Sequence, residues 1–259
     1  MSKIADKVLL IFSTFTLDRP RLRLDEIAQK SGIPGSTLYR FLQVLLKDGY
    51  LVKDSPDQTY RLGPALLLLG RVAEVALDVR TFAIPWMDWL LEKTGGHPIS
   101  VWVKFNMSRL CLESCERKGG GIKFSAHPGE IRPLYAGAAG KVLLAYMRES
   151  EVKAILQKVR LDRITPRTVT DPKRLLKQLA NIRVHGYAYS EGEYVPGAFT
   201  ISAPLLNIYG AAEACLSISG VLKGKHKPPV DDLLRNLLEA THNISEKLGY
   251  IQKKSEMNS

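Results

Sequence analysis

The sequence has few cysteines and offers little to build a disulfide framework or a metal centre. Its three cysteines, an odd number, lie in apolar, strand-like patterns that favour reduced and packed thiols. If Cys111 and Cys115 share one strand, about 13 Å separates them at roughly 3.3 Å per residue, which is too far for one metal ion. We therefore expect no disulfide, no metal site and no cofactor.

A membrane segment is also missing. The leucine run at residues 66–69 is far too short to span a bilayer, and the N-terminus lacks a basic-then-apolar leader. These absences predict a cytoplasmic protein that has no membrane partner.

The signatures of common enzyme classes are absent as well. The chain has no Gly-x-Ser-x-Gly elbow, no His-Glu-x-x-His motif and no dinucleotide-binding fingerprint. Its five histidines lie in dissimilar contexts, mostly beside proline or glycine. The sequence therefore predicts a protein that is not an enzyme. The alternative is a catalytic C-terminal domain that carries a DNA-binding-like adaptor.

The composition is that of an ordinary globular protein. The chain has 259 residues, 45% hydrophobic and 24% charged, which is enough for one large domain or two smaller ones. The formal net charge is +11, but residues 1–62, with ten Lys or Arg and seven Asp or Glu, carry only +3 of it. The basic balance therefore permits a nucleic-acid partner without locating the contact surface.

Residues 24–61 have the pattern of a helix-turn-helix followed by a β-hairpin wing. A short first helix has apolar residues at helical spacing, and Gly32 predicts its end. A second helix is predicted to begin at Pro34 or Ser36. Its apolar side, at the i, i+3, i+4 spacing, comprises Leu38, Phe41, Leu42, Leu45 and Leu46.

The opposite side of this second helix is polar and is not needed for a core, so it could enter a DNA major groove. Strands at residues 50–52 and 59–62 would form the wing, with Lys53 and Arg61 beside its tip, where they could meet phosphate. The simpler interpretation is a small helical domain with a solvated face. The predicted DNA-binding residues are Gly35, Ser36, Thr37, Tyr39, Arg40, Gln43, Lys47, Lys53 and Arg61.

The helix predicted at residues 65–79 is apolar on most of its sides. It therefore needs either a place between two domains or a second copy of itself. The second option makes a dimer, which would present two recognition helices to a two-fold DNA operator.

The remainder of the chain mixes helices and β-hairpins, which predicts an α+β domain with an antiparallel sheet. The predicted helices are 82–93, 138–148, 150–159, 171–185 and 231–248, followed by a polar tail. The predicted strands are 99–105, 110–116, 122–125, 199–205 and 211–219.

Two of these strands suggest a ligand pocket. At residues 211–219, alternate positions place Cys215, Ser217 and Ser219 on one face, and Thr200 and Ser202 alternate in the same way on the preceding strand. A small polar face beside apolar neighbours suits a modest polar ligand, although a solvated outer face fits the pattern too.

The segment 134–141 consists of small residues that run into a helix start. Backbone N–H groups there could accept a carboxylate, and tight helix packing explains the composition equally well. It is not a phosphate-binding P-loop, because Tyr135 replaces the first glycine and Val142 stands where Ser or Thr would bind magnesium.

Five segments together resemble the IclR family of bacterial transcriptional regulators over about residues 3 to 249. They are LDEIAQKSGIPGSTLYRFLQVL, YRLG at 60–63, PLYAGAAGKVLLA at 133–145, IRVHGYAYSEGEYVPG at 182–197 and CLSISG at 215–220. The resemblance implies a winged helix-turn-helix domain at 1–63, a linker helix at 64–80, a GAF-like effector domain at 81–250 and a flexible tail at 251–259. It also implies homodimers or homotetramers on double-stranded DNA, with repression or activation controlled by a small-molecule effector.

By motif position, the family's effector pocket would fall on Phe124, Ala138, Ala139, Ser190, Thr200, Ser217 and Ser219, and Cys215 is a further candidate because it shares the strand face of Ser217 and Ser219. Aromatic or hydroxylated organic acids are typical family effectors, and Lys141 or the backbone at Ala139 could hold a carboxylate. The chain departs from the family at three positions. Gly35 stands where the family often has Arg, Tyr39 stands where it often has His, and Ser190 stands where several relatives have an acidic residue. A constitutive DNA-binding protein whose second domain only oligomerises remains the alternative to a ligand-responsive regulator.

Overall fold

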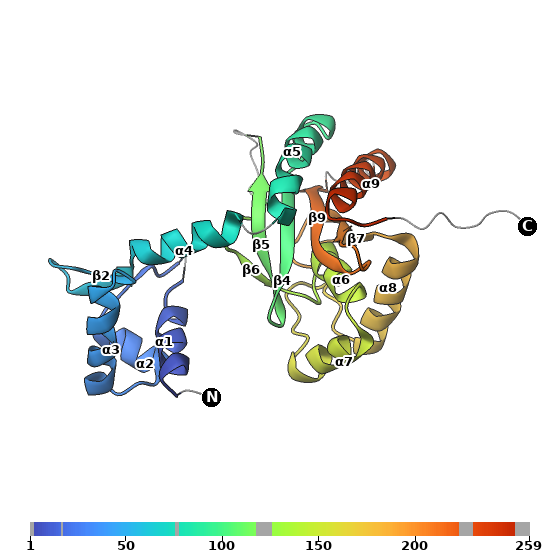
Figure 1. Cartoon of the computed structure of the whole chain (residues 1–259). Coiled ribbons are helices and arrows are strands. Elements are labelled where there is room, and N and C mark those ends of the chain that lie inside the picture. The colour runs from blue at the N-terminus through green and yellow to red at the C-terminus, as the bar shows by residue number, and fades with distance from the viewer. Residues whose placement is uncertain (1–2, 17, 76–77, 118–125, 223–229, 252–259) are drawn as a thin grey trace, which may run out of the picture. The chain divides into compact units, whose positions relative to one another are not determined.

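The computed structural model describes residues 3–16, 18–75, 78–117, 126–222 and 230–251. The chain divides into two compact units, Met1–Leu77 and Asp78–Ser259 (Figure 1). The predicted linker helix is therefore grouped with the first unit, and the second begins at Asp78. No helix in the described ranges is long and apolar enough to cross a membrane.

The first unit has the predicted helix-turn-helix with a wing. Its elements are α1 (Lys3–Ser13), β1 (Arg21–Leu22), α2 (Leu24–Ser31), α3 (Gly35–Lys47), β2 (Leu51–Asp54), β3 (Thr59–Leu62) and α4 (Pro64–Val75). Gly32 ends α2 in the left-handed conformation, at φ 67°, where a residue without a Cβ is least strained. Buried Ile11, Leu22, Leu38 and Leu42 join the helices and the wing in one core.

The wing has three strands where two were predicted. The two-residue strand β1 pairs with β3, which pairs with β2, all antiparallel. A strand this short has no alternating pattern of its own, so the periodicity of the sequence could not reveal it.

Helix α4 presents an apolar surface. Leu67, Leu68, Leu69 and Val72 are each at least 50% exposed. The exposure agrees with the prediction that this helix needs a further partner surface.

In its described residues, the second unit is an antiparallel six-stranded sheet between two helical layers (Figure 1). The strand order is β6-β5-β4-β9-β8-β7. The strands are β4 (Ile99–Phe105), β5 (Ser108–Cys115), β6 (Ile131–Pro133), β7 (Ala188–Glu191), β8 (Ala198–Leu206) and β9 (Ala212–Val221). The helices are α5 (Asp78–Lys93), α6 (Ala138–Ala145), α7 (Glu149–Lys158), α8 (Pro172–His185) and α9 (Val230–Lys247).

Both faces of this sheet are buried. Helices α5 and α9 cover one face over Ala214, Leu216 and Ile218. On the other face, α6 and α8 share a core with Trp102 and Cys215. The small polar face predicted on β9 is therefore covered, and its interpretation as a solvated outer surface is wrong.

In this unit, the residues predicted to begin and end the helix α8 do so. Asp171 caps α8 by accepting hydrogen bonds from the Lys173 and Arg174 N–H groups, at 3.3 Å and 2.9 Å, and Gly186 ends the helix at φ 78°. Strands β6 and β7 were not predicted, and α5 starts earlier than expected. The predicted strand at 122–125 lies outside the described residues.

Candidate functional site

The polar face of α3 is free in the folded first unit. Leu38, Leu42 and Leu45 are buried, whereas the side opposite them is exposed to solvent. Neither Arg40 nor Gln43 has a hydrogen bond or ion pair with another described residue, so both remain available for a partner. The predicted contacts that are exposed are Gly35, Ser36, Tyr39, Arg40, Gln43 and Lys47, and Thr37 is half-buried.

The two predicted wing contacts differ in how free they are. Lys53 is exposed, with its ammonium 5.6 Å from the centre of the Tyr60 ring. The Arg61 guanidinium is already paired with Asp54 at 3.3 Å, and Arg21 shares the same carboxylate at 3.2 Å. A phosphate would therefore compete with Asp54 for Arg61, whereas Lys53 has no such competitor among the described residues.

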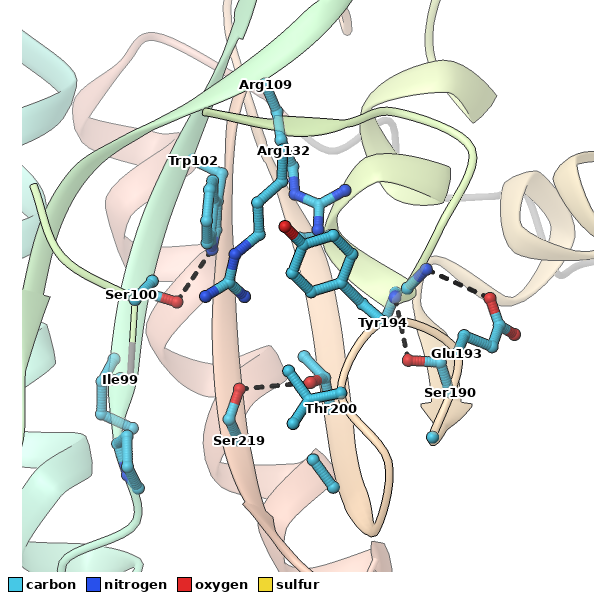
Figure 2. A pocket seen from close by; sticks show the side chains of 18 residues that line it. Ile99, Ser100, Trp102, Arg109, Arg132, Ser190, Glu193, Tyr194, Thr200 and Ser219 are labelled. Atoms are coloured by element: carbon cyan, nitrogen blue, oxygen red, sulfur yellow. Dashed lines mark hydrogen bonds between the residues drawn. The ribbon is translucent and has the colours of Figure 1, made fainter. Parts of the chain in front are cut away.

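A cleft in the second unit collects five of the eight predicted effector contacts (Figure 2). Two of them, the Thr200 and Ser219 hydroxyls, lie 3.2 Å apart across neighbouring strands. The Ser190 hydroxyl accepts a hydrogen bond from the Ala138 N–H at 2.9 Å. The predicted residues in the cleft lining are Ala138, Ala139, Ser190, Thr200 and Ser219.

The other three predicted contacts are not found there. Ser217 is fully buried and hydrogen-bonded to Ser202 at 2.7 Å, and Cys215 is fully buried with its thiol directed at the Ala139 carbonyl, at 3.4 Å. Neither side chain lines the cleft, because the helices of this face pack directly over that part of the strand. Phe124 lies outside the described residues.

An internal carboxylate already occupies the start of α6. The Gly137 N–H donates to Glu193 Oε2 at 3.1 Å, and Lys141 Nζ lies 2.5 Å from Glu193 Oε1. Lys141 also donates to Gln178 at 3.2 Å. Burial lowers the pKa of Lys141, while the adjacent Glu193 favours its charged form. The carboxylate-binding role predicted for Lys141 is thus taken by Glu193, which also binds the Gly137 N–H, while the role predicted for the backbone at Ala139 stays a prediction.

Two arginines supply the positive charge of the cleft. Arg109 on β5 and Arg132 on β6 are directly opposed in the antiparallel register. Arg109 is only 2% exposed, and burial, reinforced by Arg132, lowers its pKa to about 10. It forms no ion pair with a carboxylate of the described residues, and its Nε is buried without an acceptor.

Aromatic rings enclose these guanidinium groups. The Arg132 guanidinium carbon is 5.0 Å from the centre of the Trp102 ring and 4.7 Å from that of Tyr194. Trp102 is anchored by a 2.9 Å hydrogen bond from its indole N–H to the Ser100 hydroxyl. The cleft therefore combines positive charge, aromatic faces and hydroxyl groups, a combination suited to a small organic anion.

Sequence reasoning missed both arginines and both rings. Arg109 falls between the predicted strands 99–105 and 110–116, and Arg132 falls in no predicted element, so their pairing across adjacent strands could not be seen. The signal that could have found them is the short strand that contains Arg132, but three residues give no usable alternation.

The cysteines near the cleft are free, buried thiols. Cys111 and Cys215 are buried on the two strands that flank Trp102. Burial raises the pKa of each thiol to about 12, which leaves little thiolate for reaction or metal binding at neutral pH. The described residues contain no group of three His, Cys, Asp or Glu side chains suited to a metal ion.

The exposed recognition helix with its wing, in a chain that also has a separate cleft-bearing unit, defines a helix-turn-helix DNA-binding regulator. The model of the IclR helix-turn-helix domain matches residues 5–55, and that of the bacterial transcriptional regulator IclR C-terminal domain matches residues 73–246. The chain belongs to the IclR family of bacterial transcriptional regulators. As predicted, it is a regulator and not an enzyme.

Curated relatives carry the same description. The chain is 28% identical over 245 residues to the HTH-type transcriptional regulator XynR of Escherichia coli, covering 95% of this chain and 96% of that protein. It is 34% identical over 199 residues to the HTH-type transcriptional regulator BhcR of Paracoccus denitrificans, covering 77% of this chain and 71% of that protein.

Solved structures agree over nearly the whole length. An IclR transcriptional regulator from Alicyclobacillus acidocaldarius is 26% identical and matches with a TM-score of 0.82, covering 94% of this chain and 98% of that one. An IclR homologue from Microbacterium hydrocarbonoxydans, complexed with 4-hydroxybenzoate, is 26% identical and matches with a TM-score of 0.82, covering 95% and 99%. These matches confirm the predicted family and α+β fold class.

Proposed function

We propose that this regulator recognises a two-fold DNA operator as a homodimer or homotetramer and responds to a small organic carboxylate bound in the cleft of its second unit. The observation that carries the DNA part is the exposed polar face of α3, with Arg40 and Gln43 unpaired within the described chain. The exposed leucines of α4 support assembly with a second copy, because an apolar stripe of this kind is stabilised by burial.

The effector part is supported by the positive charge of the cleft. Its buried Arg109 lacks a carboxylate partner among the described residues, and a bound anion would supply the missing charge. Trp102 and Tyr194 hold the Arg132 guanidinium between their rings, and the relative from Microbacterium hydrocarbonoxydans was solved with an aromatic acid, 4-hydroxybenzoate.

A gel shift against the gene's own upstream region tests the DNA part. Arg40→Ala should weaken specific binding by about 1 to 3 kcal/mol if Arg40 contacts a guanine edge. Arg160→Ala is the matched control, because Arg160 is an exposed arginine of the second unit whose ion pair, among the described residues, is with Asp162 at 2.9 Å. Unchanged operator affinity in Arg40→Ala would remove Arg40 from the contact set, and no sequence-selective binding by the wild type would reject operator recognition.

Thermal unfolding of the full chain tests the effector part. The panel comprises carboxylates and their neutral amides: benzoate with benzamide, 4-hydroxybenzoate with 4-hydroxybenzamide, and propionate with propionamide. A carboxylate at 100 times its dissociation constant should add roughly 2.7 kcal/mol to the free energy of unfolding of the second unit. If none of the panel stabilises the wild type, the carboxylate effector is rejected in favour of a second unit that only oligomerises.

A further inference from the structure

The two arginines of the cleft face the same space but make different contacts. They are cross-strand partners on β5 and β6, so two positive charges lie side by side in a largely buried place. The carboxylate of Glu130 is the one that pairs with them within the described chain, and it contacts Arg132. The difference in contacts separates a structural arginine from one that is free to bind a ligand.

Arg109 is tied to the backbone. Its Nη1 donates to the Pro133 carbonyl and, at 2.8 Å, to the Ala136 carbonyl. These carbonyls belong to the segment that leads into α6, whose N-terminus forms part of the cleft wall. Arg109 therefore uses its Nη1 to hold the segment that shapes the cleft, and at 2% exposure its side chain offers little surface to a ligand.

Arg132 is held at one edge only. Its Nε and Nη2 donate to the two oxygens of Glu130 at 2.6 Å and 3.0 Å, a side-on bidentate pair. No described residue accepts a hydrogen bond from Nη1. The flanking rings of Trp102 and Tyr194 restrict the remaining rotation of the guanidinium plane.

The free end of Arg132 is directed into the cleft. Figure 2 shows its guanidinium between the Trp102 and Tyr194 rings, directed toward the part of the cleft that holds Ser219 and Thr200. A carboxylate in this space could accept hydrogen bonds from the guanidinium end on one side and from a hydroxyl on the other.

We propose that Arg132 is the specificity-determining residue that selects a carboxylate in the effector cleft, and that Glu130 is a positioning residue for its guanidinium. This inference rests on the proposed effector function and assigns the recognition of charge to one side chain. An amide of the same shape has no negative charge to offer Arg132, so the ratio of carboxylate to amide affinity measures the role of this residue.

The test compares Arg132→Gln with Arg80→Gln in the full chain, by calorimetric titration with each carboxylate and amide of the panel. Arg80 is a matched control because its guanidinium pairs with Glu113 at 2.6 Å in the same unit, and Arg80 does not line the cleft. Loss of a charge-assisted hydrogen bond predicts that Arg132→Gln weakens the carboxylate about 10- to 100-fold. The amide affinity should stay within about twofold, and Arg80→Gln should leave the ratio unchanged.

Arg132→Lys provides the second variant, since it keeps the charge without the planar edge, and should give an intermediate carboxylate-to-amide ratio. Equal weakening of carboxylate and amide, or an unchanged ratio in Arg132→Gln, overturns the role of Arg132 while the effector cleft stands. If the wild type and both variants bind no member of the panel, the proposed effector function and this inference fail together.

Discussion

Glu193→Ala is expected to destabilise the second unit by about 3 to 5 kcal/mol, because removing one partner leaves a buried charge without compensation. Lys141 is only 2% exposed, and its ammonium lies 2.5 Å from the Glu193 carboxylate. The same substitution also leaves the Gly137 N–H without its acceptor. Urea denaturation of the full chain, followed through the transition of the second unit, measures the loss.

A second variant separates the charge from the packing. Glu193→Ala with Lys141→Met removes both charges and should recover much of the lost stability, because an apolar side chain of similar length has no charge to desolvate. Glu149→Ala is the control for an exposed pair in the same unit, since Glu149 contacts Lys153 on the surface of α7, and we expect little change there. A double variant no more stable than Glu193→Ala would contradict this explanation.

Gly140→Ala is expected to destabilise the second unit by about 3 kcal/mol through overpacking. A Cβ at this position would overlap the Leu134 carbonyl oxygen and the Arg109 Nη1, and would lie 2.7 Å from the Leu134 carbonyl carbon. Backbone atoms cannot move aside as a flexible side chain can, so α6 itself would have to shift. The shift should also disturb the Arg109 hydrogen bonds that shape the cleft.

Gly70→Ala is the matched control for this substitution. Gly70 is also helical, in α4, and a Cβ there meets nothing within 4 Å. Helix propensity then predicts a gain of up to about 1 kcal/mol in the first unit. Thermal and urea unfolding measure both variants. If Gly140→Ala changes the free energy of unfolding as little as Gly70→Ala does, the predicted overlap of a Cβ at position 140 with Leu134 is contradicted.

Structural features that depend on residues close together in the chain were predictable from the sequence. The leucines of α3 and the glycine at position 32 were enough to place the helix-turn-helix, because helical spacing and a left-handed stop depend on a few adjacent residues. The cap at Asp171 was predictable for the same reason, since its hydrogen bonds reach only two and three residues ahead.

Features that depend on long-range pairing were not predictable. Arg109 and Arg132 become neighbours only when β5 pairs with β6, and the sequence gives no register for a three-residue strand. The burial of Ser217 was missed because alternation separates the two faces of a strand without showing what covers each face. The hydroxyl face was correctly recognised, but only its Ser219 and Thr200 end lines the cleft.

The shared carboxylate of Asp54 has a consequence for how the wing would respond to ionic strength. Arg21 and Arg61 both contact it in the free protein, at 3.2 Å and 3.3 Å. When such an arginine moves from Asp54 to a DNA phosphate, the freed carboxylate takes up cations from solution. The net release of counterions is therefore smaller than for a basic side chain that has no carboxylate partner in the free protein. The slope of log affinity against log salt concentration should therefore be shallower than the number of basic side chains on the wing suggests. Lys53 should supply most of the wing's contribution to that slope.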